Sequence, residues 1–159
     1  VNNAGLGLYA SIHEADPQDW RTMFDVNVLG VLYVTQAAVR RMLRQGSGHL
    51  VFVSSLAARR VPSAEATVYA ATKHAITAVV EGLRMDLRDK GIRVTSVEPA
   101  LVRTAFPEST YPSAEEFYAG KGYAPLEAED VASAVLYAVE QPPRVSVDEI
   151  LVRSTEQPK

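Results

Sequence analysis

Two short apolar runs separated by a helical pattern set the fold class of this chain. Leu50-Val51-Phe52-Val53 has no polar residue, which is typical of a parallel strand buried on both faces. We expect this strand over 49–55 and a second one over 92–97, closed by Glu98-Pro99. A helical pattern over 68–90 lies between them and ends at Gly91. Strands that alternate with helices predict right-handed crossovers and a parallel sheet, which is an α/β fold.

The other elements follow from caps and from the spacing of apolar residues. Asp16-Pro17 is typical of an N-cap followed by proline at the first helical position, and it predicts a helix with Trp20, Met23 and Phe24 facing inward. A second helix, expected over 28–45, is apolar nearly all round and therefore needs cover on two sides. We also expect a strand at the start of the chain, a helix around 131–139 and a last short strand over 148–153.

Composition excludes several functional classes. The net charge of −3 and the lack of a basic cluster interleaved with aromatics give no footprint for nucleic acid. There is no cysteine, and His13, His49 and His74 lack ligand spacing, so we expect no metal site. The most apolar stretch, residues 26–39, is shorter than a bilayer requires, and no signal-peptide pattern is visible. A cytoplasmic enzyme without a membrane partner is the class that fits.

Tyr69 and Lys73 are the first candidates for chemistry. Residues four apart share one face of a helix, so the lysine would lie about one turn from the phenol. Lowering a tyrosine pKa from ~10 to ~7 requires about 4 kcal/mol of preferential stabilisation of the phenolate. One ammonium at ~4 Å in a partly screened site supplies about that much. Alternatively, the two residues form a surface pair worth a few tenths of a kcal/mol.

Three polar or small-residue segments are expected to meet at one edge of the sheet. Asn3-Ala4-Gly5, Ser54-Ser55 and Pro99-Ala100 each follow a predicted strand. In parallel sheets, ligands bind outside the carboxyl ends of the strands. This convergence predicts a ligand site at that edge.

Five ordered motifs resemble those of the short-chain dehydrogenase/reductase family. They are Asn2-Asn3-Ala4-Gly5, Asn27 in its helix, Ser54-Ser55, Tyr69-x-x-x-Lys73 and the stretch Glu98–Thr104. The resemblance implies a Rossmann-like doubly wound parallel sheet over residues 1–159, of which this chain would be the C-terminal portion. Gln18-Asp19-Trp20, Gly48-His49 and Glu149-Ile150-Leu151 add a likeness to NADP-dependent members that oxidise serine and related 3-hydroxy acids.

The resemblance also implies catalytic roles. Tyr69 would be the general acid/base of hydride transfer between NAD(P) and an alcohol or carbonyl compound. Lys73 would lower the Tyr69 pKa and hold the nicotinamide ribose, and Ser55 would donate a hydrogen bond to the substrate oxygen. Asn27 would break the regularity of its helix and hold a water in a proton relay from Lys73. Ser54 remains an alternative to Ser55, and Asn27 remains open as a satisfied core asparagine.

Further residues are implied as cofactor contacts. Gly5 would allow close backbone approach, and Ala100, which replaces the usual glycine, leaves the local backbone angles open. The implied cofactor is NADP, with NAD possible, and the expected contacts are Asn3, Ala4, Gly5, Tyr69, Lys73, Pro99, Ala100, Val102 and Thr104.

The irregular stretch 103–125 is rich in aromatic residues, and we expect it to be a lid over the substrate. Within it, Ser113-x-x-Glu116 is typical of a helix cap. We also expect a portion upstream of Val1, carrying a glycine-rich phosphate turn, and therefore weak cofactor binding by this chain alone. An isomerase or lyase with retained nicotinamide and an inactive scaffold remain alternatives. The full-length protein is expected to form a homotetramer or homodimer.

Overall fold

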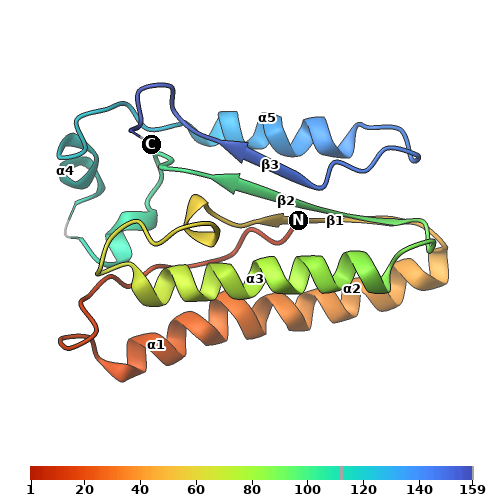
Figure 1. Ribbon diagram of the computed structural model, residues 1–159, viewed down its shortest axis with the longest axis horizontal. Helices are drawn as coiled ribbons and strands as arrows, with labels where there is room; N and C mark the ends of the chain where they lie inside the picture. Colours follow the sequence, from red (N-terminus) through yellow and green to blue (C-terminus); the bar gives the residue numbers. More distant parts are fainter. Residues whose placement is uncertain (112, 159) are drawn as a thin grey trace.

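The computed structural model describes residues 1–111 and 113–158 and contains a three-stranded sheet. The strands are β1 (Gly48–Val53), β2 (Ile92–Pro99) and β3 (Glu149–Val152), in the order β1-β2-β3, and both pairs are parallel. The helices are α1 (Pro17–Phe24), α2 (Val31–Gln45), α3 (Thr67–Asp86), α4 (Ala114–Ala119) and α5 (Ala128–Val139), with a π-helical segment η1 (Asp25–Gly30) and 3-10 turns η2 (Leu56–Ala58) and η3 (Phe106–Ser109). In Figure 1, α2 and α3 lie side by side below the sheet and α5 lies above it. The predicted α/β fold with a Rossmann-like parallel sheet is confirmed.

The start of the chain runs along the free edge of β1. Asn2 forms a parallel bridge with Phe52, in which the Asn2 amide donates to Val51 O (2.7 Å) and Val53 N donates to Asn2 O (2.9 Å). The strand expected at the start of the chain is thus a single bridge in this structure. It nevertheless sets Asn3 and Gly5 beside the carboxyl end of β1.

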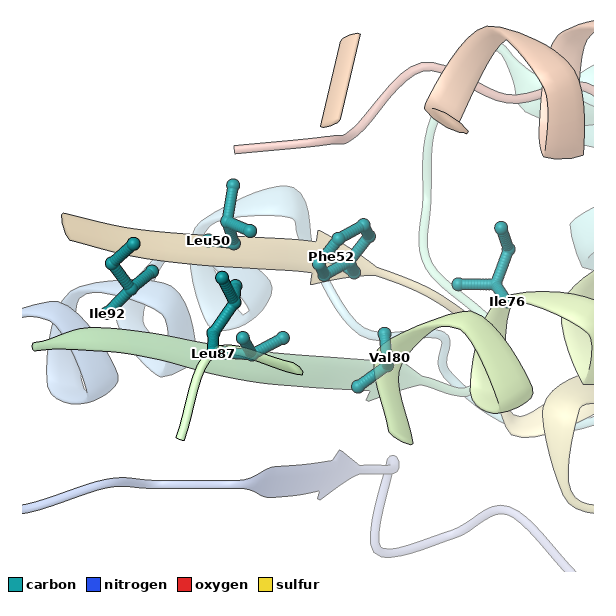
Figure 2. Close-up of a cluster of buried hydrophobic side chains, with 7 residues drawn as sticks. Leu50, Phe52, Ile76, Val80, Leu87 and Ile92 are labelled. Atoms are coloured by element: carbon teal, nitrogen blue, oxygen red, sulfur yellow. The ribbon is translucent and has the colours of Figure 1, made fainter. Parts of the chain in front are cut away.

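The larger apolar core lies between the sheet and α3 (Figure 2). Leu50 and Phe52 from β1 face Ile76 and Val80 from α3, and none of these four side chains is more than 4% exposed. Burial of a large aliphatic or aromatic side chain contributes about 1.5–3 kcal/mol. This core fixes α3, the helix that carries Tyr69 and Lys73, against the sheet.

The segments α1, η1 and α2 form one continuous helix from Pro17 to Gln45. By length and composition this helix could cross a membrane, with 17% of its most apolar window buried in this chain. The apolar stretch was expected to be too short to span a bilayer. This expectation is wrong, because the helix that contains the stretch is long enough. Helices that pack against a second subunit share this composition, and Asn27 in its middle is buried within the domain.

Several predicted boundaries and facings differ from the structure. Met23 is 1% exposed as expected, whereas Phe24, which was expected to face inward, is 41% exposed. The helix expected from residue 28 begins within the π-helical turn Asp25–Gly30 and continues as α2 from Val31. The helix expected over 68–90 ends at Asp86, and Asp89 has φ 62°, a left-handed conformation that no helix continues through.

The described residues of the stretch 103–125, which are 103–111 and 113–125, include η3 and α4. Two main-chain hydrogen bonds join the two ends of the stretch. Arg103 N donates to Leu126 O (2.7 Å), and Leu126 N donates to Leu101 O (2.9 Å). The predicted cap is confirmed, since Ser113 Oγ accepts from Glu116 N at the start of α4. The Tyr118 hydroxyl lies 2.7 Å from Val102 O and 3.0 Å from Thr104 N, so it fastens α4 to the base of the stretch.

Candidate active site

A cleft of about 1410 Å³ opens at the carboxyl ends of the strands. The arrowheads in Figure 1 point toward this end, where η3 and α4 lie. Every residue expected to be catalytic or to contact a cofactor lines the cleft, with the exception of Asn27. The fold thus brings together three segments that are far apart in the sequence, as the parallel sheet predicts.

Tyr69 and Lys73 lie one turn apart on α3 and are 7% and 6% exposed. Lys73 Nζ is 5.7 Å from the centroid of the Tyr69 ring and donates a long hydrogen bond to Val53 O (3.4 Å). A buried ammonium with three donors and one weak acceptor has capacity for further partners. Its position at the floor of the cleft suits it to hold hydroxyl groups of a ligand.

The pKa values of this pair differ from the expectation. Burial raises the pKa of Tyr69 to about 12, and the neighbouring Ser55 hydroxyl opposes this rise by hydrogen bonding. Burial also lowers the pKa of Lys73 to about 8. Desolvation of the phenolate therefore raises the Tyr69 pKa overall in the chain without ligands, and the role of Lys73 in lowering it stays a prediction.

The two serines of the pair have different surroundings. The Ser55 side chain accepts from Ala57 N (3.1 Å) at the start of η2 and lies close enough to Tyr69 to oppose the rise of its pKa. Ser54 is 5% exposed, and among the described residues its hydroxyl has no hydrogen-bond partner although it lines the cleft. Ser55 therefore acts on the phenol, whereas the Ser54 hydroxyl can take a ligand as its partner.

Asn27 lies behind the cleft, where it holds the loop that follows Gly5. Its Oδ1 accepts from Leu6 N (2.9 Å), and its Nδ2 donates to Leu6 O (2.8 Å) and to Thr72 Oγ1 (3.1 Å). The π-helical turn Asp25–Gly30 places this amide inward, so the helix is irregular at the expected residue. Both amide protons are engaged within the protein, as in a satisfied core asparagine.

The segments expected to contact a cofactor leave room for one. A Cβ added to Gly5 would lie 3.3 Å from Asn27 Oδ1 and 3.6 Å from Lys73 Nζ, so glycine keeps the approach to the lysine open. Ala100 N donates to Val152 O (2.8 Å), and Ala100 does not adopt a positive φ. Alanine is therefore accommodated in place of glycine without backbone strain.

Two residues of the site escaped the sequence analysis. Thr72 is fully buried and connects Asn27 to α3, because its hydroxyl donates to Tyr69 O (2.7 Å) and accepts from Asn27 Nδ2. The ring of Tyr9 meets the ring of Tyr69 edge-on, with centroids 5.6 Å apart. The sequence offered a signal for Thr72, since it is a polar residue next to Lys73 in the predicted helix. It offered no signal for Tyr9, because that residue lies in a loop without a periodic pattern or a motif.

Metal ligands do not gather in the part of the chain that the structure describes. Among residues 1–111 and 113–158, no group of three histidine, aspartate or glutamate side chains could hold a metal ion. The polar side chains that line the cleft are hydroxyls, the amides of Asn3 and Gln157, the ammonium groups of Lys73 and Lys121 and the guanidinium of Arg60, which suit sugars and phosphates better than metals.

Comparisons with known proteins identify the family. A model of the short chain dehydrogenase family matches residues 1–114. An uncharacterized oxidoreductase of Staphylococcus aureus strain USA300 is 39% identical over 153 residues, which are 96% of this chain and 62% of that protein, so this chain spans less than two thirds of the length of that relative.

Solved structures agree with this assignment. The closed form of a serine dehydrogenase complexed with NADP+ is 31% identical, with a TM-score of 0.92 over 100% of this chain and 67% of that one. The serine dehydrogenase of Escherichia coli is 30% identical, with a TM-score of 0.81 over 98% of this chain and 63% of that one. The predicted resemblance is confirmed, and the chain belongs to the short chain dehydrogenase family of oxidoreductases.

Proposed function

We propose that the protein transfers a hydride between NADP and a small alcohol or carbonyl compound. The observation that carries this proposal is the meeting of Tyr69, Lys73 and Ser55 at the floor of one cleft at the carboxyl ends of the strands. A phenol, an ammonium and a hydroxyl in this arrangement can bind one substrate oxygen and exchange a proton with it.

Tyr69 acts as the acid in carbonyl reduction. Burial keeps its phenol neutral, so at pH 7 it carries the proton that the carbonyl oxygen needs. The Ser55 hydroxyl lies beside the phenol and donates a hydrogen bond to the same oxygen as negative charge develops there. In alcohol oxidation the proton moves in the opposite direction.

Lys73 has the second role in this proposal. Its ammonium holds ribose hydroxyls, and the charge so positioned favours loss of the Tyr69 proton when the site is filled. The amide protons of Asn27 are engaged by Leu6 and Thr72, so a water of the relay assigned to Asn27 must donate to an acceptor there. The main chain of the π-helical turn and the second lone pair of Asn27 Oδ1 are the acceptors that remain for a water.

The cleft fits a nicotinamide cofactor at its sugar-binding half. The unpartnered Ser54 hydroxyl, the donors of Lys73 and the open approach at Gly5 all suit a ribose. Bound there, the cofactor supplies or accepts the hydride, and Pro99, Ala100, Val102 and Thr104 line the same cleft. NADP is favoured over NAD because the serine dehydrogenase with a TM-score of 0.92 was solved with NADP+.

The segment 103–125 acts as the lid of the site in this proposal. It contributes Phe106, Tyr111 and Phe117 to the lining, so the substrate side of the cleft is partly apolar. Small hydroxy acids, their oxo forms and simple alcohols are the substrate classes to be tried first.

The test is a turnover assay of the complete protein. Purified protein is mixed with NADP+ and a panel of alcohols and hydroxy acids, or with NADPH and the matching carbonyl compounds, and nicotinamide absorbance is followed. The proposal expects turnover that depends on both cofactor and substrate. Cofactor binding without turnover of any alcohol or carbonyl compound would favour the isomerase or scaffold alternative.

A further inference from the structure

The Tyr69 ring is covered on two sides by aromatic rings from distant parts of the chain. The centroid of Tyr9, from the loop after Gly5, lies 5.6 Å away, and that of Phe106, from η3 in the lid, lies 5.7 Å away. Both rings approach at steep interplanar angles of 74° and 61°, which is the favoured edge-to-face geometry. The cover of the phenol therefore depends on where the lid lies.

Three hydrogen bonds fasten this part of the lid to the loop after Gly5. The hydroxyls of Ser109 and Thr110 lie 2.6 and 3.0 Å from Gly7 O, and both can donate to it. Thr110 Oγ1 also accepts from Tyr9 N at 3.1 Å. Thr110 is thus hydrogen-bonded to the main chain of the loop at both Gly7 O and Tyr9 N. These two bonds fix the residues 7–9, which include Tyr9 and its ring.

Gly7 lets the lid come this close. A Cβ at Gly7 would lie 2.9 Å from the Tyr9 hydroxyl and 3.0 Å from the Phe106 ring. Real Cβ atoms rarely approach other atoms so closely, so any side chain would push Phe106 away. The glycine, the hydroxyls and the two rings form one contact between loop and lid.

The polar groups that face Tyr69 come from three elements. They are the titratable Lys73 on α3 and Tyr9 phenol of the loop, and the Ser55 hydroxyl after β1, which does not titrate. From the lid, Phe106 faces it without a charge, while Tyr111 and Tyr118 influence Tyr9 instead. The described residues of the lid (103–111 and 113–125) bring no charged group to the phenol, so they affect Tyr69 by excluding water.

We propose that Phe106 and Thr110 are positioning residues of the lid. Thr110 docks the lid on the loop after Gly5, Phe106 is thereby pressed on the Tyr69 ring, and the phenol is held in place and shielded from water. Docking of the lid and positioning of the general acid are then one event. A docked lid holds the Tyr69 ring in place, and an undocked lid lets water reach the phenol. This role rests on the proposed function of Tyr69.

The test follows the Tyr69 proton directly, without any turnover. The complete protein is labelled with tyrosine carrying ¹³C at Cζ, the Tyr69 resonance is assigned with Tyr69→Phe, and its shift is titrated toward alkaline pH. Burial raises the wild-type pKa to about 12. Phe106→Leu and Thr110→Val should each lower this midpoint by about one pH unit, since water then reaches the phenol.

Matched variants separate this role from general packing. Phe117→Leu also removes a lid ring, but one that contacts Tyr111 and Tyr118, so the Tyr69 midpoint should stay at the wild-type value. Thr110→Ser keeps the hydroxyl and should restore the wild-type midpoint. Unchanged titration in both Phe106→Leu and Thr110→Val overturns the proposal, as does an equal shift in Phe117→Leu. If the shifts occur but the protein turns over no substrate, the proposed function fails and the coupling stands.

Discussion

The side-chain amide of Asn27 and the main chain of Leu6 are joined by two hydrogen bonds, one in each direction. Leu6 N donates to Oδ1 at 2.9 Å, and Nδ2 donates to Leu6 O at 2.8 Å. The amide thus pairs with Leu6 as a neighbouring strand would. This contact fixes the loop between Gly5 and Tyr9, which forms one wall of the candidate site.

Loss of this amide should destabilise the protein. Asn27→Ala removes three hydrogen bonds and leaves the Leu6 main chain without its partner, so we expect a loss of about 2–4 kcal/mol in the free energy of unfolding. Urea denaturation of the purified variant measures it. Asn3→Ala is the control, because Asn3 is exposed and its loss should change stability by less than about 0.5 kcal/mol. Equal stabilities of the two variants would contradict the structural role of Asn27.

Lys73 should make stability depend on pH. Burial lowers its folded pKa to about 8 from the usual 10.5, so between these values the unfolded chain binds one proton more than the folded protein. Stability from this group therefore rises as pH increases through that window, and the folded state carries a penalty of about 3 kcal/mol below it. Lys73→Met should be more stable than the wild type at pH 7.

The measurement for Lys73 is the difference in unfolding free energy between wild type and variant at pH 7 and pH 10, without cofactor. The account predicts that the difference shrinks as pH rises. A difference that is constant with pH would show that Lys73 is not desolvated.

The two serines should differ in their effect on catalysis. Ser55→Ala removes the donor next to the phenol, and we expect kcat to fall by about 10²–10³-fold. Ser54→Ala should act mainly on the KM for the cofactor, since its hydroxyl has no partner among the residues that the structure describes. Steady-state kinetics of the two variants side by side distinguish these effects, and a larger fall of kcat in Ser54→Ala would exchange the two roles.

The exposed apolar face of α2 should mediate self-association. Tyr33 and Val34 are 69% and 61% exposed, and such a face on a long helix requires cover. We expect the complete protein to be a homodimer or homotetramer that uses this face. Val34→Glu should then yield a smaller species in size-exclusion chromatography with light scattering. The control Val61→Glu alters a valine outside the helices that is 53% exposed, and an identical mass for both variants and the wild type would exclude this interface.

The sequence predicted the layout of the site because its signals are local. The apolar run at Leu50–Val53 fixed a strand, the strand fixed its carboxyl end, and Ser55 followed from that position. The helix cap at Ser113 could likewise be predicted, since it depends only on one side chain and on the main-chain amide three residues later.

Properties that depend on burial could not be predicted in the same way. The spacing of Tyr69 and Lys73 indicated a pair, but the pKa shifts depend on how much water the fold removes, and they have the opposite direction for the tyrosine. The contacts of Tyr69 with Tyr9 and with Phe106 join residues from three distant segments. No periodic pattern in the sequence predicts such a contact. Phe24 shows the same limit, because its apolar side chain was expected to face inward and is 41% exposed.

The most direct test of the account compares wild type with Tyr69→Phe in hydride transfer. Phenylalanine keeps the ring between Tyr9 and Phe106 and removes only the hydroxyl, so folding and cofactor binding should persist. In a single-turnover experiment with NADPH and a carbonyl substrate, the account predicts that the rate of nicotinamide oxidation falls by at least about 10³-fold. A Tyr69→Phe variant that transfers hydride at the wild-type rate would remove Tyr69 from the chemistry and contradict the account.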